Sequence, residues 1–234
     1  LLVAVVLRNG VDDAKWLTDR QKRLIKADLA TDDGHKVRHA SVLTFVGDPR
    51  IWLMAVIYFT IVVGQYAITF WLPTLVRNSG VTEPFHIGLL TAIPYICAIG
   101  AMVFVGRSSD RRLERRWHLV IPMIVGAIAL TLAATVGDVV VLSICALCVA
   151  AAGILSASSI FWMLPTNVLG GVSAAAGIAA VNSFANIGGF VSPFLIGWIT
   201  TSTGSGAIGM YLITGLMLIG SLFVLRVPAA LVNR

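Results

Sequence analysis

Six long apolar stretches, separated by short polar or charged segments, dominate the pattern of residues along the chain. They predict helices at about residues 51–75, 86–105, 119–136, 139–164, 173–200 and 207–225. Each stretch is long enough to cross a membrane, because about 20 apolar helical residues span a hydrocarbon core of roughly 30 Å. The pattern therefore predicts an all-α membrane protein whose six transmembrane helices form one bundle.

A polar region at residues 8–49 precedes these stretches. The residues before it, 1–7, are apolar and end at Arg8, as expected where an earlier membrane helix reaches the membrane surface. We therefore divide the chain into the end of a preceding transmembrane helix at 1–7, a cytoplasmic linker at 8–49 and a six-helix bundle at 50–234. On this division we expect the chain to be the second part of a longer protein, with a natural half-length protein as the alternative.

The linker contains one predicted helix. Thr18 and Gln21 have the spacing of a capping box, in which each side chain bonds the other residue's backbone N–H group. This predicts a short amphipathic helix that continues to about Ala30 and is ended by Asp32-Asp33-Gly34. Its basic face and its apolar face leave two roles open: the helix either lies on the inner leaflet or forms a solvated linker.

Basic residues cluster on the segments that flank the spans. Of the 17 Lys and Arg residues, nine lie between Arg8 and Arg50, five lie between Arg107 and Arg116, and two are Arg226 and Arg234. Six spans put both chain ends and the segment at 107–116 on one side. Because cytoplasmic loops are enriched in basic residues, we predict an inner-membrane protein with both ends in the cytoplasm. The clustering also explains the net charge of +6 without a nucleic-acid partner.

Composition agrees with a protein surrounded by the lipid bilayer. Apolar residues make up 58% of the chain and charged residues 12%, whereas soluble domains have about half and a quarter. No nucleophile–base pair or cluster of metal ligands can be assembled from the spans, so we predict no enzyme activity, metal or cofactor. Cys145 and Cys148 match a C-x-x-C spacing, but they lie within an apolar span and are interpreted as small packing residues.

A short repeat relates the first and fourth spans. Phe70-Trp71-Leu72-Pro73-Thr74 closes the first, and Phe161-Trp162-Met163-Leu164-Pro165-Thr166 closes the fourth. The first span runs outward and the fourth inward, so the two copies fall on opposite membrane faces. An inverted repeat of three plus three helices produces this arrangement. A chance match is the alternative, because Trp and Pro are common near membrane interfaces.

The segment at 106–116 resembles the cytoplasmic loop motif of the major facilitator superfamily, G-x-x-x-D-R-x-G-R-R. The matching residues, which we predict to form a gating loop, are Gly106, Asp110, Arg111 and Arg115. The Gly allows two helices to approach closely, and the Asp near a helix end can pair with an Arg and hold the inward gate shut. The segment departs from the motif at Leu113, where the motif has Gly, and at Glu114, where it has Arg.

Other stretches resemble the anion:cation symporter family within that superfamily, which includes phthalate and tartrate permeases. They are residues 12–18, 70–74, 94–95, 109–111, 114–118, 161–166 and 182–193. The resemblance covers nearly the whole chain. It implies the C-terminal half of a major facilitator fold, in which a 3+3 inverted repeat builds the six-helix bundle.

Polar side chains within the spans mark a candidate substrate site, because in lipid such groups face a cavity or another helix. The candidates are Tyr58, Gln65, Tyr66, Trp162, Asn182 and Asn186. Asn and Gln carry both donors and acceptors, which suits the hydroxyls and carboxylates of a small organic acid. The resemblance implies that the first and fifth spans line the central cavity. Hydrogen bonding between helices is the alternative role, and Trp162 is alternatively an interface anchor.

Charged residues and histidines are absent from the deep parts of all six spans. Proton coupling needs a titratable group there, and a carboxylate substrate needs a cation, so we expect both in a missing N-terminal six-helix half. The resemblance implies half of a secondary active transporter, which couples symport of a small organic anion, a carboxylate or sugar acid, to protons or sodium by alternating access. A non-transporting six-helix scaffold or sensor is the alternative.

Overall fold

The structure, a computed structural model, describes residues 11–14, 16–34, 47–78, 80–136, 139–168, 172–229 and 233. The helices are α2 (Asp19–Gly34), α4 (Pro49–Asn78), α5 (Pro84–Arg112), α6 (Arg116–Thr135), α7 (Val140–Phe161), α8 (Met163–Val168), α9 (Val172–Thr203) and α10 (Gly206–Arg226). No strand occurs among the described residues. Residues 1–7, predicted as the end of an earlier helix, lie outside them.

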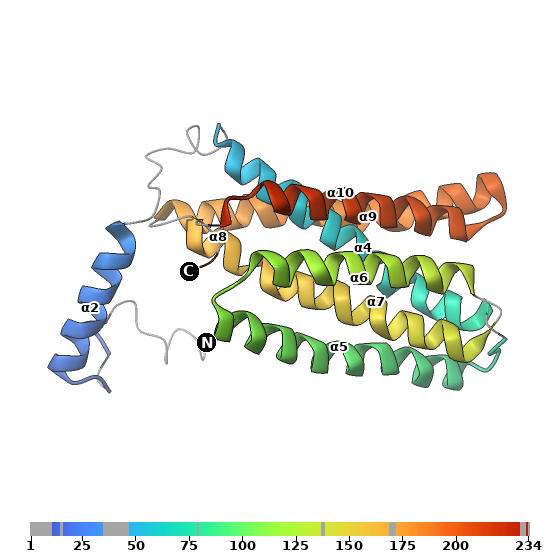
Figure 1. The fold of residues 1–234 in the computed structure, drawn as a ribbon, viewed down its shortest axis with the longest axis horizontal. Helices are drawn as coiled ribbons and strands as arrows, with labels where there is room; N and C mark the ends of the chain where they lie inside the picture. Colours follow the sequence, from blue (N-terminus) through green and yellow to red (C-terminus); the bar gives the residue numbers. More distant parts are fainter. Residues whose placement is uncertain are drawn as a thin grey trace.

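The six predicted spans are confirmed as long apolar helices, with α7 and α8 together forming the fourth. Figure 1 shows them side by side with alternating direction, so that the start of α4, the α5–α6 connection and the end of α10 lie at one end of the bundle. We call this the basic end, because Arg50, the arginines between residues 107 and 116, and Arg226 belong to it. The prediction of an all-α six-helix membrane bundle is correct.

The second span extends further than its apolar pattern predicted. Helix α5 continues to Arg112, so Gly106, Asp110 and Arg111 lie in its last two turns instead of in a loop. Arginine is a good helix former and is favoured near the C-terminus of a helix dipole. The helix therefore continues beyond the apolar stretch, and the predicted gating loop is reduced to residues 113–115.

Two other helices also end later than predicted. The loop expected at 201–206 begins only at Gly204, and within the longer helix the hydroxyls of Thr201, Ser202 and Thr203 bond to carbonyl groups of the preceding turn. Helix α2 runs through Asp32-Asp33 to Gly34. Its predicted start is correct: Thr18 N–H donates to Gln21 Oε1 over 3.0 Å, and Gln21 N–H donates to Thr18 Oγ1 over 3.4 Å.

The helices pack as an inverted repeat of two triplets requires. The first triplet is α4, α5 and α6, and the second is α7 with α8, α9 and α10. Helix α4 packs against α9 and α10 of the second triplet, and α7 packs correspondingly against α5 and α6 of the first. The pairs α4–α7 and α6–α10 pack across the same axis, so exchanging the triplets preserves these neighbours. The two copies of the Phe-Trp-containing repeat lie at opposite ends, since α4 ends far from the basic end and α8 lies at it (Figure 1).

The backbones of α6 and α7 lie very close together at Gly153. A Cβ atom added to Gly153 would lie 2.5 Å from the carbonyl oxygen of Pro122 and 2.7 Å from the backbone nitrogen of Gly126. These are backbone atoms, which cannot move aside as a flexible side chain can. Glycine at position 153 therefore allows the two helices to pack at this distance.

Candidate functional site

Tyr58 of α4 and Trp162, at the junction of α7 and α8, are the first pair of predicted site residues that the structure brings together. The Trp162 indole N–H donates to the Tyr58 hydroxyl over 3.2 Å. The Tyr58 ring stacks on Phe161 with ring centroids 4.5 Å apart, and it meets the Trp162 ring edge-on at 4.7 Å. Trp162 thus packs on Tyr58 of the neighbouring helix α4, and its two predicted roles, substrate binding and interface anchoring, stay predictions.

Gln65 lies near the middle of α4, and its side chain is half-buried. The Ser158 hydroxyl of α7 donates to Gln65 Oε1 over 3.4 Å. This weak bond holds the amide oxygen, while the amide N–H groups have no partner among the described residues. Gln65 can therefore donate two further hydrogen bonds from the middle of the membrane.

Asn182 and Asn186 lie one turn apart near the middle of α9, and both side chains are exposed. Asn186 Nδ2 donates to Asn182 Oδ1 over 3.0 Å and to the Asn182 carbonyl oxygen over 2.8 Å. The shared bond orients the two amides relative to each other. The remaining oxygen of Asn186 and the N–H groups of Asn182 are left to interact outside the helix.

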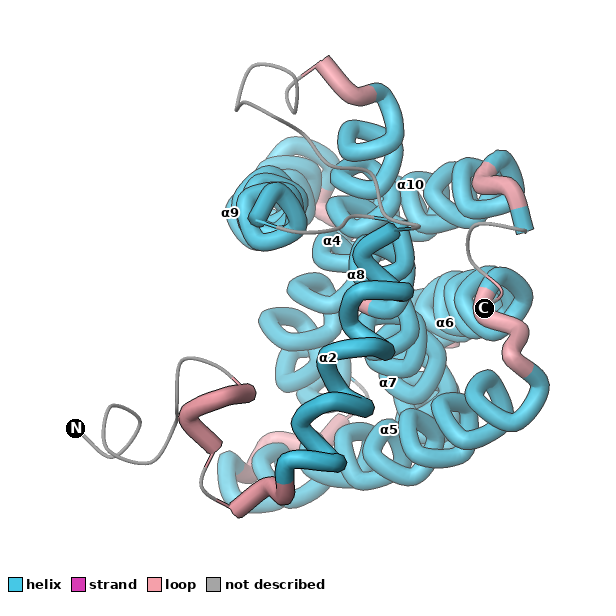
Figure 2. Tube along the Cα trace, turned by 90° about the vertical axis from the view of Figure 1, so that its left-hand side faces the viewer, coloured by secondary structure: helices cyan, strands magenta, loops and turns pink. Residues whose placement is uncertain are grey.

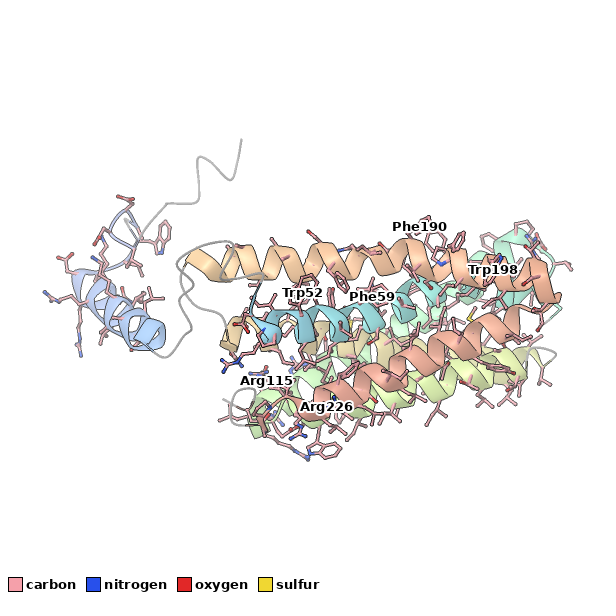
Figure 3. The ribbon with its side chains drawn as sticks, turned by 90° about the horizontal axis from the view of Figure 1, so that it is seen from above. Trp52, Phe59, Arg115, Phe190, Trp198 and Arg226 are labelled. Carbon is pink, nitrogen blue, oxygen red and sulfur yellow. The ribbon has the colours of Figure 1, made fainter. Side chains whose placement is uncertain are left out.

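Tyr66 contributes to helix packing. Its ring lies against α9, where a Cβ atom on Gly189 would come within 2.9 Å of it, and it stacks on Phe70 at 6.0 Å. Nearby, the Tyr95 hydroxyl of α5 donates to Thr69 Oγ1 over 3.5 Å. Trp52 and Phe59 of α4 pack on Phe184 of α9 in the same seam, towards the basic end (Figure 3).

The structure therefore arranges the predicted residues as separate pairs. Tyr58 meets Trp162 and Asn182 meets Asn186, whereas no hydrogen bond joins the asparagines to Gln65 or Trp162 among the described residues. Sequence reasoning missed two partners, Ser158 and Tyr95. A hydroxyl on an apolar helix gave no signal for Ser158, because Ser and Thr side chains commonly bond their own helix backbone.

At the basic end, Asp110 forms the ion pair that the motif predicts. Arg115 Nη1 lies 2.8 Å from Asp110 Oδ1, and the Arg115 side chain is only 8% exposed, against 65% for Asp110. The Arg115 backbone N–H donates to Asn233 Oδ1 over 2.9 Å. Gly106 does not bring two helices together in this bundle, because no described atom lies within 4 Å of a Cβ placed there. Arg111 is exposed.

Glu114, which stands where the motif has Arg, caps the start of α6. Its carboxylate accepts hydrogen bonds from the backbone N–H groups of Trp117 at 2.9 Å and His118 at 3.3 Å, and lies 2.9 Å from His118 Nδ1. Asn233 Nδ2 donates to it over 3.4 Å. Burial raises the pKa of Glu114, but these hydrogen bonds outweigh burial, and the pKa is lowered overall.

This network predicts a pH-dependent contribution to stability. We expect Glu114→Gln to lower the free energy of unfolding by about 1 kcal/mol at neutral pH, as the loss of a charged helix cap does. A carboxyl group whose pKa is lowered on folding stabilises the protein above its unfolded value, 4.5 here, and stops doing so as the pH falls through the folded value. Thermal melts in detergent at pH 7 and at about pH 3 check this. A difference between the two proteins that persists in acid would contradict the role of the charge.

Comparison with known proteins identifies the fold. The sequence model of the Major Facilitator Superfamily matches residues 1–193, which is more than half of the chain. The chain belongs to the major facilitator superfamily.

Relatives in this superfamily match the whole chain or nearly all of it. It is 39% identical to a Pseudomonas putida protein named as metabolite transport protein NicT, over all of this chain and 54% of the relative. It is 37% identical to a protein of Agrobacterium vitis named as a tartrate transporter, and equally to the quinolone resistance transporter of Acinetobacter baumannii, each over 96% of this chain and about half of the relative. The chain spans about half the length of these relatives and corresponds to their C-terminal half.

Leu113 occupies a position where the superfamily motif has Gly, and the backbone conformation there shows why Gly is favoured. Its φ of 48° and ψ of 34° lie in the left-handed region, which glycine adopts without steric cost. Leu113 N–H bonds to the Asp110 carbonyl and Glu114 N–H bonds to the Ser109 carbonyl, the two bonds of a Schellman motif. A leucine there pays about 1–2 kcal/mol for its backbone conformation.

We therefore expect Leu113→Gly to raise the free energy of unfolding by about 1 kcal/mol. The Leu113 side chain is exposed, so its removal costs little packing. The measurement is the melting temperature of the purified protein in detergent, which should rise by roughly 2–4 °C for a chain of this size. Leu113→Ala, which removes the same side chain but retains a Cβ atom, is the matched control and should not stabilise.

Proposed function

We propose that this chain is the C-terminal half of a secondary active transporter for small organic anions. The observation that carries the proposal is the set of uncharged amides near mid-membrane depth, on Gln65, Asn182 and Asn186, with donors and acceptors left free by their own contacts. Such groups are costly in lipid and suit the hydroxyl and carboxylate oxygens of a hydroxy acid. The names of the relatives support transport of a metabolite, tartrate among them.

The proposed transporter includes a second six-helix half as the partner of this bundle. Helices α5 and α9, which occupy equivalent places in the two triplets, are the two least buried spans. We infer that a second six-helix half covers them, encoded upstream or supplied separately, and that the two halves rock around the amide-bearing face. Within the described residues, charged side chains on the spans lie only near the helix ends. The second half then supplies the cation for the substrate and the group that couples transport to protons or sodium.

The distribution of basic residues gives the bundle a proposed orientation in the membrane. Both ends of the described bundle and its charged connection lie at the basic end (Figure 3 shows Arg115 and Arg226 there and Trp198 far from it). We assign this end to the cytoplasm of an inner membrane by the positive-inside rule.

The test is uptake of labelled tartrate by sealed membrane vesicles. The vesicles contain the protein expressed from the complete coding unit to which this chain belongs. The DNA upstream of Leu1 is read first, so that any further helices encoded there are included. We expect saturable uptake that an inward proton or sodium gradient accelerates. Uptake of a quinolone but of no hydroxy acid would contradict the proposed organic-anion substrate. Uptake of neither compound would favour the scaffold or sensor alternative.

A further inference from the structure

A groove runs along one flank of the bundle between α5 and α6. Two adjoining cavities form it, with volumes of about 320 and 400 Å³, and both are lined by Val105, Ile121 and Pro122. Helices α5 and α6 each pack extensively against α7, which lies between them in Figure 2 and forms the floor of the groove. The second six-helix half inferred above covers α5, but no function considered above uses the side of α5 that faces α6.

The deeper part of the groove is apolar. Its remaining lining residues are Cys97, Ala101, Val125, Cys148, Val149, Ala152, Gly153 and Ser156. Ile121 and Val125 of α6 and Val149 of α7 are exposed along it. In a membrane this surface meets hydrocarbon, and its small floor residues leave room for a chain to lie between the helices.

The mouth of the groove, at the basic end, is positively charged. Arg112 and Trp117 line it together with Ser108, Glu114 and His118. The Glu114 carboxylate is occupied by the cap of α6 and by His118, and His118 Nε2 lies 3.0 Å from Ser108 Oγ. Arg112 has no ion-pair partner among the described residues, and Arg107 and Arg111 share an adjoining hollow with it.

The length of the groove fits one leaflet. Arg112 and Cys97, at its two ends on α5, are 15 residues apart in one helix. At about 1.5 Å per residue, this is roughly 22 Å. One leaflet of hydrocarbon is about 15 Å thick, so the groove reaches from the headgroup level to the middle of the bilayer. Trp117 is exposed at the level where interfacial tryptophans lie.

We propose that this groove binds one anionic phospholipid, with its phosphate at Arg112 and one acyl chain along the floor formed by α7. The arginines select a net negative headgroup, because a guanidinium pairs well with phosphate and the acidic groups nearby are already bonded. The other turn between neighbouring triplet helices, at 204–205 between α9 and α10, carries no charge, so the same headgroup has no counterpart there. The proposal requires only the membrane-embedded bundle and does not depend on the transported substrate.

Native mass spectrometry of the full chain in mild detergent tests the proposal, with phosphatidylglycerol added in increasing amounts and phosphatidylethanolamine as the zwitterionic comparison. We expect Arg112→Gln to weaken phosphatidylglycerol binding about tenfold, as the loss of one charge-assisted contact does. Arg226→Gln removes the same charge at the same end but on α10, and should leave binding unchanged. Ile121→Trp, which fills the groove without changing charge, should also weaken binding, whereas Leu222→Trp on the exposed face of α10 should not.

Each result decides the proposal. The proposal is supported if Arg112→Gln and Ile121→Trp weaken binding while the controls, Arg226→Gln and Leu222→Trp, do not. An equal effect of Arg226→Gln would show diffuse attraction instead of a site, and unchanged binding in Ile121→Trp would show that no acyl chain occupies the groove. Equal affinity of the unmodified chain for the two lipids would overturn the role of charge. Both main substitutions are at exposed or half-exposed positions, and melting temperatures confirm that the variants are folded.

Discussion

Gly153→Leu is expected to destabilise the bundle by about 3 kcal/mol, the upper part of the range for overfilled cores. The added Cβ alone would lie 2.5 Å from the Pro122 carbonyl oxygen and 2.7 Å from the Gly126 nitrogen. Because both atoms belong to the backbone of α6, the clash can be relieved only by moving α6 and α7 apart. Such a movement loses packing along a seam that both triplets share.

The measurement is the melting temperature in detergent, which we expect to fall by several degrees. Gly197→Leu on α9 is the matched control, because a Cβ atom there meets no described atom within 4 Å. Gly153→Ala should fall between the unmodified chain and Gly153→Leu. Equal melting temperatures for Gly153→Leu and Gly197→Leu would show that the α6–α7 seam does not limit stability.

Gln65→Leu is expected to raise the KM for anion uptake ten- to a hundredfold in the complete transporter. Leucine has nearly the same size but removes the amide that donates from mid-membrane, and a hydrogen bond to a charged group is worth about 1.5–3 kcal/mol. Asn186→Leu should act in the same direction, because its amide lies at a similar depth on α9. This prediction depends on the proposed transport function and is measured by labelled uptake over a range of substrate concentrations.

Thr131→Val is the matched control. The Thr131 hydroxyl donates to Thr214 Oγ1 over 3.0 Å, which joins α6 to α10 on another side of the bundle. Its loss removes a polar contact between helices but no group of the proposed site, so KM should stay unchanged. If Gln65→Leu also leaves KM unchanged, the bond from Ser158 is the whole role of Gln65, and hydrogen bonding between helices explains the residue.

The predicted site was recoverable from sequence in part. Polar residues inside apolar spans are visible as such, and spacing placed Asn182 and Asn186 on one helix face. That Trp162 would bond Tyr58, a residue 104 positions earlier, depends on how α7 packs on α4. Glu114 looked like a departure from a motif, and only the fold showed that its carboxylate caps α6.

Sequence alone was sufficient for the number of spans, their approximate limits and the capping box of α2. Each of these depends on one segment, because transfer to hydrocarbon and helix capping act on a helix by itself. The spans are apolar nearly all round, so the pattern does not distinguish a face that meets lipid from a face that meets another helix. Contacts between helices therefore settled the tight seam at Gly153 and the charged groove at Arg112, because both require two helices to be brought together in space.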